Sequence, residues 1–329
     1  MFNIGACHID SQVLLAPMAG VTDIPFRRQC RAFGAGLTTS EMITSDTKMW
    51  QSRKSSTRLV VEHQDYPVSM QIAGSDPMQL ADAAQACVEV GAEIIDINMG
   101  CPAKKVCKKA AGSALLADEP LVARILTAVV DSVNVPVTLK TRTGTDGDNK
   151  NGEIVAKLAE QSGVSAIAIH GRTRACRFTG KAEYDTIRRI AQSVDIPVLA
   201  NGDICSAEQA RTVLDYTGAA AILIGRAALG KPWLFQEIKH FLETGTPSLA
   251  LTLQKKRAVI LEHVRSVHAF YGETQGVRLA RKHFGWYCES LPNGQHSRKE
   301  FNQLGEADKQ ISHIKEYFFR LKTNEDKAA

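Results

Sequence analysis

The segment from residue 94 to 106 reads Ile94-Ile95-Asp96-Ile97-Asn98-Met99-Gly100-Cys101-Pro102-Ala103-Lys104-Lys105-Val106. Its nearly continuous apolar run, closed by glycine and proline, predicts a short buried strand that ends abruptly in a loop. Asn98 and Cys101 then lie at the carboxyl end of this strand, with lysines directly after them. An amide, a thiol and several cations gathered at a strand end indicate a functional site.

Seven more segments have the strand pattern, and helical patterns separate nearly all of them. They cover residues 13–20, where a strand runs into a turn, and residues 37–42, 68–73, 135–142, 166–170, 196–201 and 220–225. Eight strands alternating with helices predict a closed parallel (β/α)8 TIM barrel, because an open doubly wound sheet usually stops near six strands. The fold class that we expect is therefore α/β.

The pattern changes after Pro247. Residues 252–271, 276–290 and 306–322 predict helices with no strand between them. We therefore expect a barrel domain over residues 1–244 and a smaller all-helical C-terminal domain over residues 245–329.

The composition is that of an ordinary globular protein, with 44% hydrophobic and 23% charged residues. No apolar run is long enough to span a membrane, and the N-terminus lacks the basic and apolar segments of an export signal. The eight cysteines are scattered without CxxC spacing, so we expect neither a disulfide scaffold nor a metal site. These features favour a reducing cytoplasm.

The positive charge is concentrated near the C-terminus. Residues 1–244 hold 26 Lys and Arg against 26 Asp and Glu, whereas residues 245–329 hold 14 against 9. A solvated helical face would account for this surplus. Binding to a polyanion is the more specific alternative.

Polar residues stand at nearly every expected strand end, where barrel enzymes place their chemistry. A single residue of this kind has a simpler explanation, since a lone amide often caps a loop and a lone cysteine often packs as a small hydrophobe. The same pattern at nearly every strand end favours an active site. They are Met18, Glu41, Gln71, Asn98 with Cys101, Lys140 with Arg142, His170 with Arg172, Asn201 with Asp203, and Gly225 with Arg226.

The last two strand ends carry a phosphate-binding pattern. Asn201-Gly202-Asp203-Ile204 and Ile224-Gly225-Arg226 place glycines where backbone N–H groups can approach an anion, with an arginine to neutralise it. No GxGxxG follows a strand, so a Rossmann dinucleotide site is not expected. We expect a phosphorylated cofactor at this place.

Together these blocks resemble the tRNA-dihydrouridine synthases, flavoenzymes that reduce uridine in tRNA. The continuation Ala103-Lys104-Lys105-Val106 is most similar to the bacterial B-type subfamily. The resemblance covers the barrel in order and continues weakly into the helical region. The blocks that carry it are Ala16-Pro17-Met18-Ala19-Gly20-Val21-Thr22-Asp23, Asn98-Met99-Gly100-Cys101-Pro102, Leu139-Lys140-Thr141-Arg142-Thr143-Gly144, Ile169-His170-Gly171-Arg172-Thr173, Asn201-Gly202-Asp203-Ile204 and Ile224-Gly225-Arg226.

The resemblance implies roles for individual residues, with FMN as the cofactor and NADPH or NADH as the reductant. It implies Cys101 as the proton donor and Asn98 as a residue that orients the target base. Thr141 departs from the apolar residue expected there, which should affect packing only. The cofactor residues implied are Pro17, Met18 and Ala19 beside the flavin ring, Gln71, Lys140 and His170 near it, and Asn201, Gly202, Asp203, Gly225 and Arg226 at the ribityl and phosphate groups.

The resemblance also implies tRNA, through its D arm, as the partner of a monomeric protein. Basic residues would then contact the RNA backbone, because phosphate neutralisation dominates such binding. Arg53, Lys54, Arg58 and Arg177 would surround the barrel mouth, and Arg298 and Lys299 would extend the surface. The substrate-binding residues that we expect are Asn98, Lys104, Lys105, Arg142, Arg172, Arg174, Arg278, Arg281 and Lys282.

The chemistry of the residues agrees with such a reaction. Reducing the C5–C6 double bond of uracil needs a hydride, which a flavin supplies, and a proton, which a thiol with an ordinary pKa of about 8.5 can donate at neutral pH. Lysines close to that thiol would lower its pKa, so Lys104 and Lys105 are expected to face phosphates instead.

Two other functions remain open from the sequence. A barrel oxidoreductase acting on a free pyrimidine or another small molecule would explain the cofactor blocks, but it has little use for a basic helical appendage. A non-catalytic RNA-binding protein would explain the charge, but not Cys101, Lys140 and His170 at strand ends.

Overall fold

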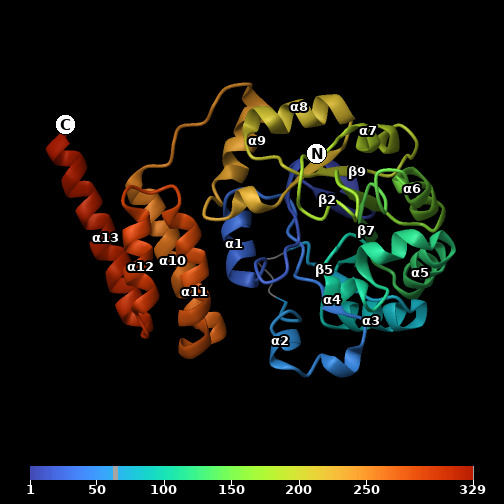
Figure 1. The fold of residues 1–329 in the computed structure, drawn as a ribbon, viewed down its shortest axis with the longest axis horizontal. Coiled ribbons are helices and arrows are strands. Elements are labelled where there is room, and N and C mark those ends of the chain that lie inside the picture. The colour runs from blue at the N-terminus through green and yellow to red at the C-terminus, as the bar shows by residue number, and fades with distance from the viewer. Residues whose placement is uncertain (62–65, 329) are drawn as a thin grey trace.

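The computed structural model describes residues 1–61 and 66–328, and its centre is an eight-stranded parallel sheet (Figure 1). The strand order is β3-β10-β9-β8-β7-β6-β5-β4, so strands that follow one another in sequence are neighbours and β3 lies beside β10. The strands are β3 (Val13–Leu15), β4 (Ile43–Thr44), β5 (Ser69–Ala73), β6 (Ile94–Asn98), β7 (Val137–Arg142), β8 (Ala166–His170), β9 (Val198–Asn201) and β10 (Ala221–Ile224).

The segment before β4 closes the sheet into a barrel. Isolated parallel bridges join Leu15 to Thr38 and Thr39 to Ser69. The expectation of a continuous strand over residues 37–42 was therefore wrong, since the ladder to β5 starts only at Ile43. The reason is local: the Gln71 N–H bonds to the hydroxyl of Ser40 at 3.0 Å, so a side chain takes the place of a backbone acceptor. The predicted α/β barrel itself is confirmed.

Helices cover the outside of the barrel, and a β-hairpin closes the end at which the strands begin. The hairpin, β1 (Phe2–Ile4) with β2 (Cys7–Ile9), buries Ile4 and Ile9 against apolar residues inside the barrel, so the carboxyl ends of the strands form the open end. The helices are α1 (Ile24–Ala32), α2 (Arg53–Ser56), α3 (Pro77–Glu89), α4 (Lys104–Cys107), α5 (Glu119–Ser132), α6 (Gly152–Gln161), α7 (Asp185–Ala191), α8 (Ala207–Thr217) and α9 (Leu234–Thr244).

Four helices follow the barrel in the described part of the chain: α10 (Leu253–Tyr271), α11 (Glu273–Cys288), α12 (Gly294–Gln303) and α13 (Ala307–Ala328). They share a hydrophobic core of their own, in which Phe284 stacks on Phe301 with ring centroids 4.2 Å apart. The sequence did not predict α12, because its buried positions include one large apolar residue, Phe301, and this is too few to produce a helical period. None of the described helices is long and apolar enough to cross a membrane.

The barrel and the helical region meet closely at Gly230. A Cβ atom at this position would lie 2.3 Å from the backbone oxygen of Trp286 in α11, and φ is +67°. Gly180 has nearly the same φ, +68°, but a Cβ atom there would meet no neighbouring atom within 4 Å. We expect Gly180→Ala to cost about 1 kcal/mol from the left-handed backbone alone. Gly230→Ala should cost roughly 3 kcal/mol or more, because two backbone segments must separate as well. Urea unfolding of both variants measures the difference, and equal losses would contradict the close approach.

Candidate active site

The register of the sheet aligns the polar residues at the open end. Asn98 pairs with Lys140, Arg142 with His170, and His170 with Asn201. Neighbouring parallel strands therefore bring these side chains to one edge, as expected for an α/β barrel.

Gln71 and Asn98 belong to a buried hydrogen-bonded chain that begins at Asp96. The Asn98 amide donates to Gln71 Oε1 at 2.9 Å, and the Gln71 amide donates to Asp96 Oδ2 at 2.6 Å. Thr138 donates its hydroxyl to Asp96 Oδ1 at 2.7 Å. Sequence reasoning missed the role of Asp96, although a lone carboxylate within a run of isoleucines was a usable signal. The chain fixes the orientation of both amide side chains.

Asn98 also holds Cys101 in place. Its Oδ1 atom accepts the N–H groups of Gly100 at 3.2 Å and Cys101 at 3.0 Å. Burial raises the pKa of the Cys101 thiol, while the N–H of Ala103 opposes this shift. The thiol is therefore protonated at neutral pH, which is the state needed by a proton donor. Lys104 and Lys105 are exposed.

Lys140 and His170 differ in charge. Lys140 is buried and donates to Asn201 Oδ1 at 3.0 Å, and burial lowers its pKa to about 8. Burial and then Lys140 lower the pKa of His170 to about 2, so the imidazole is neutral. Arg172 lies 3.2 Å from its Nε2 atom and donates to it, which places the ring proton on Nδ1. The site thus offers a cation and a neutral N–H donor side by side.

Arg142 and Arg172, both expected to contact substrate, are buried and bonded to the protein itself. Arg142 donates to the carbonyl oxygens of Gly100 at 2.7 Å, Thr173 at 3.0 Å and Arg177 at 2.7 Å. Arg172 donates to Asp203 at 2.6 and 3.0 Å. These guanidinium groups therefore tie together the loops after β6, β8 and β9.

The loops after β9 and β10 are joined by Asp203. Its carboxylate accepts the N–H of Ala182 at 2.8 Å and a guanidinium N–H of Arg226 at 3.1 Å, and the Arg226 side chain is 62% exposed. A Cβ atom at Gly225 would have Met18 Sδ at 3.9 Å and Ala16 Cβ at 4.0 Å as its nearest neighbours. A Cβ atom there would therefore be in ordinary van der Waals contact with Met18, while Pro17 is half-buried and Ala19 exposed in the same segment.

A basic cavity of about 340 Å³ lies beside the loop that follows Cys101, and its lining also includes the carboxylate of Asp146. Its wall combines Lys104 and Arg174 with Arg177, whereas Lys105 is exposed next to it. Cys107 also lines this cavity and lies 3.6 Å from the backbone oxygen of Cys101. The side chains of Arg53 and Lys54 lie outside the described part of the structure.

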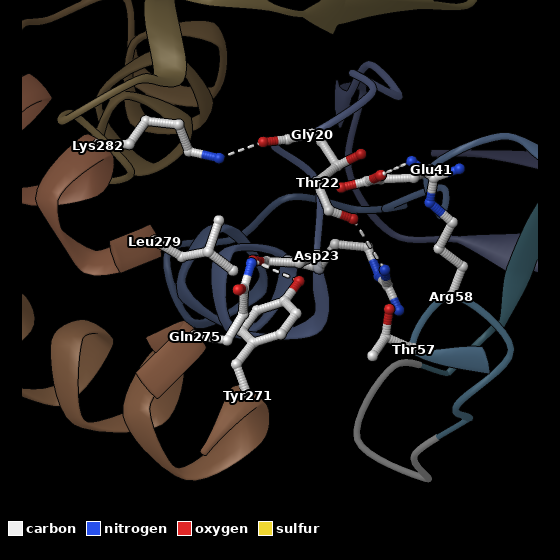
Figure 2. A pocket seen from close by; sticks show the side chains of 11 residues that line it. Gly20, Thr22, Asp23, Glu41, Thr57, Arg58, Tyr271, Gln275, Leu279 and Lys282 are labelled. Carbon is white, nitrogen blue, oxygen red and sulfur yellow. Dashed lines mark hydrogen bonds and ion pairs between the residues drawn. The ribbon is translucent and has the colours of Figure 1, made fainter. Parts of the chain in front are cut away.

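A second cavity, of about 330 Å³, lies between the barrel and the helices α10 and α11 (Figure 2). On its helical side Tyr271 donates to Asp23 Oδ2 at 3.1 Å and Lys282 donates to the Gly20 carbonyl. On its barrel side Arg58 forms an ion pair with Glu41. Sequence reasoning missed Tyr271 and Gln275 as lining residues, because only the docking of the helices brings them to the barrel.

The three cations predicted on α11 have different surroundings. Arg278 is exposed, and its spacing from Gln275 and Lys282 places it on the face of the helix that borders the second cavity. Arg281 is half-buried and donates to the Leu304 carbonyl at 3.1 Å. Lys282 is the one that contacts the barrel.

The fold and the strand-end residues define an α/β-barrel enzyme with a helical appendage beside its mouth. The family described as dihydrouridine synthase (Dus) matches residues 14–323, and the chain belongs to this family. The resemblance seen in the sequence blocks is thereby confirmed.

Relatives named tRNA-dihydrouridine synthase B match nearly the whole chain. The one from Pseudomonas aeruginosa is 58% identical over 322 residues, which cover 98% of this chain and 97% of that protein. The one from Vibrio parahaemolyticus is 53% identical over 316 residues, with 96% and 98% covered. The one from Shewanella oneidensis is 51% identical over 322 residues, with 98% and 100% covered.

Proposed function

We propose that this enzyme reduces the C5–C6 double bond of uridine in tRNA to 5,6-dihydrouridine, with FMN as cofactor and NADPH or NADH as reductant. The observation that carries the proposal is that Asn98, itself bonded to Gln71, holds the backbone N–H of Cys101 at the mouth of a barrel. Family membership and the names of the relatives support the same reaction. We place the enzyme in the cytoplasm as a monomer.

The residues at the strand ends fit a phosphorylated flavin. Lys140 uses one of its three N–H donors on Asn201, and the remaining donors suit the oxygens of a flavin ring. Gly225 lies beside Met18 without a side chain of its own, and Arg226 presents an exposed guanidinium for one phosphate. Gln71, His170, Gly202 and Asp203 complete the cofactor site in this proposal, with Pro17 and Ala19 at its rim.

In this proposal the side chains of the protein have separate tasks in the reaction. Asn98, held by Gln71 and Asp96, orients the uracil edge by hydrogen bonds. Cys101 donates its Sγ proton to one carbon of the double bond. The hydride for the neighbouring carbon is the chemistry that a bound, reduced flavin would supply. Arg142 and Arg172 keep the loops after β6 and β8 in the geometry that these steps need.

The helical region over residues 245–329 is the tRNA-binding domain of this proposal. A base inside a folded RNA must leave its stack to reach the barrel mouth, at a cost of a few kcal/mol. Contacts with the D-arm backbone from the basic cavity, through Lys104, Lys105 and Arg174, and from exposed Arg278 would offset that cost. Arg281 and Lys282 donate to backbone carbonyls of the protein, so in this proposal they would hold the RNA-binding surface in place without contacting the RNA directly.

The cofactor assignment has a direct test. The purified protein should be yellow, and denaturation should release FMN and not FAD, because the loops after β9 and β10 offer one phosphate site without a dinucleotide fingerprint. Chromatography of the released flavin identifies it. Release of FAD, or a colourless protein that cannot be reconstituted with FMN, would overturn the assignment.

The reaction itself is tested in cells that lack this protein. Dihydrouridine should disappear from one or more positions of their tRNA and return on complementation. A free-pyrimidine reductase predicts instead an unchanged pattern of dihydrouridine, and such a result would sink the proposed function.

A further inference from the structure

Three buried side chains meet where α10 and α11 dock on the barrel. Asp23 precedes α1, His263 lies in α10 and His283 in α11, and one ligand-type atom from each lies within 4.8 Å of the others. Both histidines are 1% exposed. None of the barrel-mouth residues of the proposed reaction belongs to this cluster.

The imidazole nitrogens of the cluster have unused bonding capacity. Nε2 of His263 and both ring nitrogens of His283 are buried without a hydrogen-bond partner. An unsatisfied buried polar atom costs about 1–3 kcal/mol, so three of them in one place indicate a missing ligand. The carboxylate nearest to them is Asp23, whose Oδ2 lies 3.8 Å from His283 Nε2.

His263 and Asp23 also have hydrogen-bond partners of the kind that orient metal ligands in proteins. Tyr287 Oη lies 2.9 Å from His263 Nδ1, so an Nδ1–H can donate to it and leave the Nε2 lone pair facing the cluster. Asp23 Oδ1 accepts the N–H of Phe26 at 3.0 Å, and its Oδ2 accepts Tyr271 Oη. Such partners hold ligating histidines and carboxylates in orientation.

The protonation states also suit a cation. Burial lowers the pKa of His263 to about 3 and holds that of His283 well below its usual value, so both rings are neutral lone-pair donors. Burial raises the pKa of Asp23 to about 6, which leaves its carboxylate mostly ionised at pH 7. Lys282 opposes a bound cation, and Glu41, which faces the same cavity, offsets that charge.

We propose that Asp23, His263 and His283 bind one divalent transition-metal ion, with Zn²⁺ as the best match, at the junction of barrel and helical region. Two imidazoles and one carboxylate form a ligand set that Zn²⁺ accepts, and a water completes four-coordination. Zn–N and Zn–O distances of about 2.0–2.2 Å put tetrahedral ligand atoms about 3.4 Å apart, so a ligand pair at 4.8 Å would close by roughly 1.4 Å when the ion binds.

Such an ion would be structural. It would join three segments that are far apart in sequence, namely the residue before α1 and the two helices α10 and α11. Asp23 lies close in sequence to Met18 at the flavin rim, and it lines the second cavity (Figure 2). The ion would thereby fix the helical region against the mouth of the barrel.

The test measures metal binding on the purified full-length protein, without tRNA or turnover. After EDTA treatment and desalting, incubation with Zn²⁺ should restore about one ion per chain by elemental analysis and raise Tm by about 2–4 °C or more. Co²⁺ should give the visible absorption of a four-coordinate ion without thiolate charge-transfer bands, which separates this site from the free cysteines. These readouts do not depend on the proposed reaction.

Variants locate the ion. His283→Gln and Asp23→Asn should each lose the stoichiometric ion and the Co²⁺ spectrum, and asparagine retains the N-cap of α1. His296→Gln is the control, because His296 has a 74% exposed side chain paired with Glu300. If His283→Gln fails to fold, the Co²⁺ spectrum of the unmodified chain still decides. The proposal would be overturned if the unmodified protein bound no ion, or if His283→Gln bound as much metal as the unmodified protein.

Discussion

Replacing Cys101 by alanine is expected to lower dihydrouridine formation by roughly 10²- to 10⁴-fold, the usual contribution of a general acid. NADPH should still reduce the flavin at a normal rate, because the thiol is needed only for the later proton transfer. Burial raises the pKa of Cys101, so the wild-type rate should fall at alkaline pH as the thiol ionises. Stopped-flow flavin absorbance separates the two half-reactions, and mass spectrometry of digested tRNA measures the product.

Cys107 provides a matched control within the same loop. Its sulfur lies 3.6 Å from the Cys101 carbonyl oxygen and 3.8 Å from the Ser113 hydroxyl, so its removal disturbs the same backbone without touching the reacting thiol. Cys107→Ala should retain activity within a few-fold. Loss of flavin reduction in Cys101→Ala, or an equal loss of product in both variants, would mean that Cys101 has a structural role.

Removing the residues after Thr246 is expected to weaken tRNA binding by orders of magnitude while flavin binding persists. Every proposed cofactor contact lies at or before Arg226, and the helical region carries the whole excess of positive charge. Trp233 packs into the core of the helices, so the shortened protein exposes it and should be less soluble. Filter binding and the flavin spectrum measure the two properties. Undiminished tRNA affinity would remove this region from the RNA surface.

The salt dependence of tRNA binding by single variants shows which cations of the helical region contact phosphates. The wild-type protein should show a steep negative slope of log affinity against log salt, because binding releases counterions from phosphates. Arg278→Ala should make the slope shallower by about one unit or less. Arg281→Ala and Lys282→Ala should change it less, since these side chains bond to the Leu304 and Gly20 carbonyls. Lys309 pairs with Glu306, so Lys309→Ala serves as the control. Slopes that agree within error would favour a merely solvated helical face.

Local sequence patterns predicted much of the fold and supplied the list of candidate site residues. Apolar runs ended by glycine or proline indicated the strands, because a buried parallel strand leaves a nearly continuous apolar signature. The exceptions have local causes. Residues 37–42 did not form a continuous strand where the Ser40 hydroxyl replaces a backbone acceptor, and α12 has too few apolar residues to show a period.

The sequence by itself determined the α/β barrel, the family and the residue types at the strand ends, since each depends on neighbours along the chain. Only the tertiary structure decided what those residues contact. Arg142 and Arg172 are occupied by backbone carbonyls and Asp203, and Asp96 orients Gln71. The meeting of Asp23 with His263 and His283 has no signature in the sequence, because more than 200 residues separate the first from the others. Such contacts depend on how two hydrophobic cores pack together, which no local period encodes.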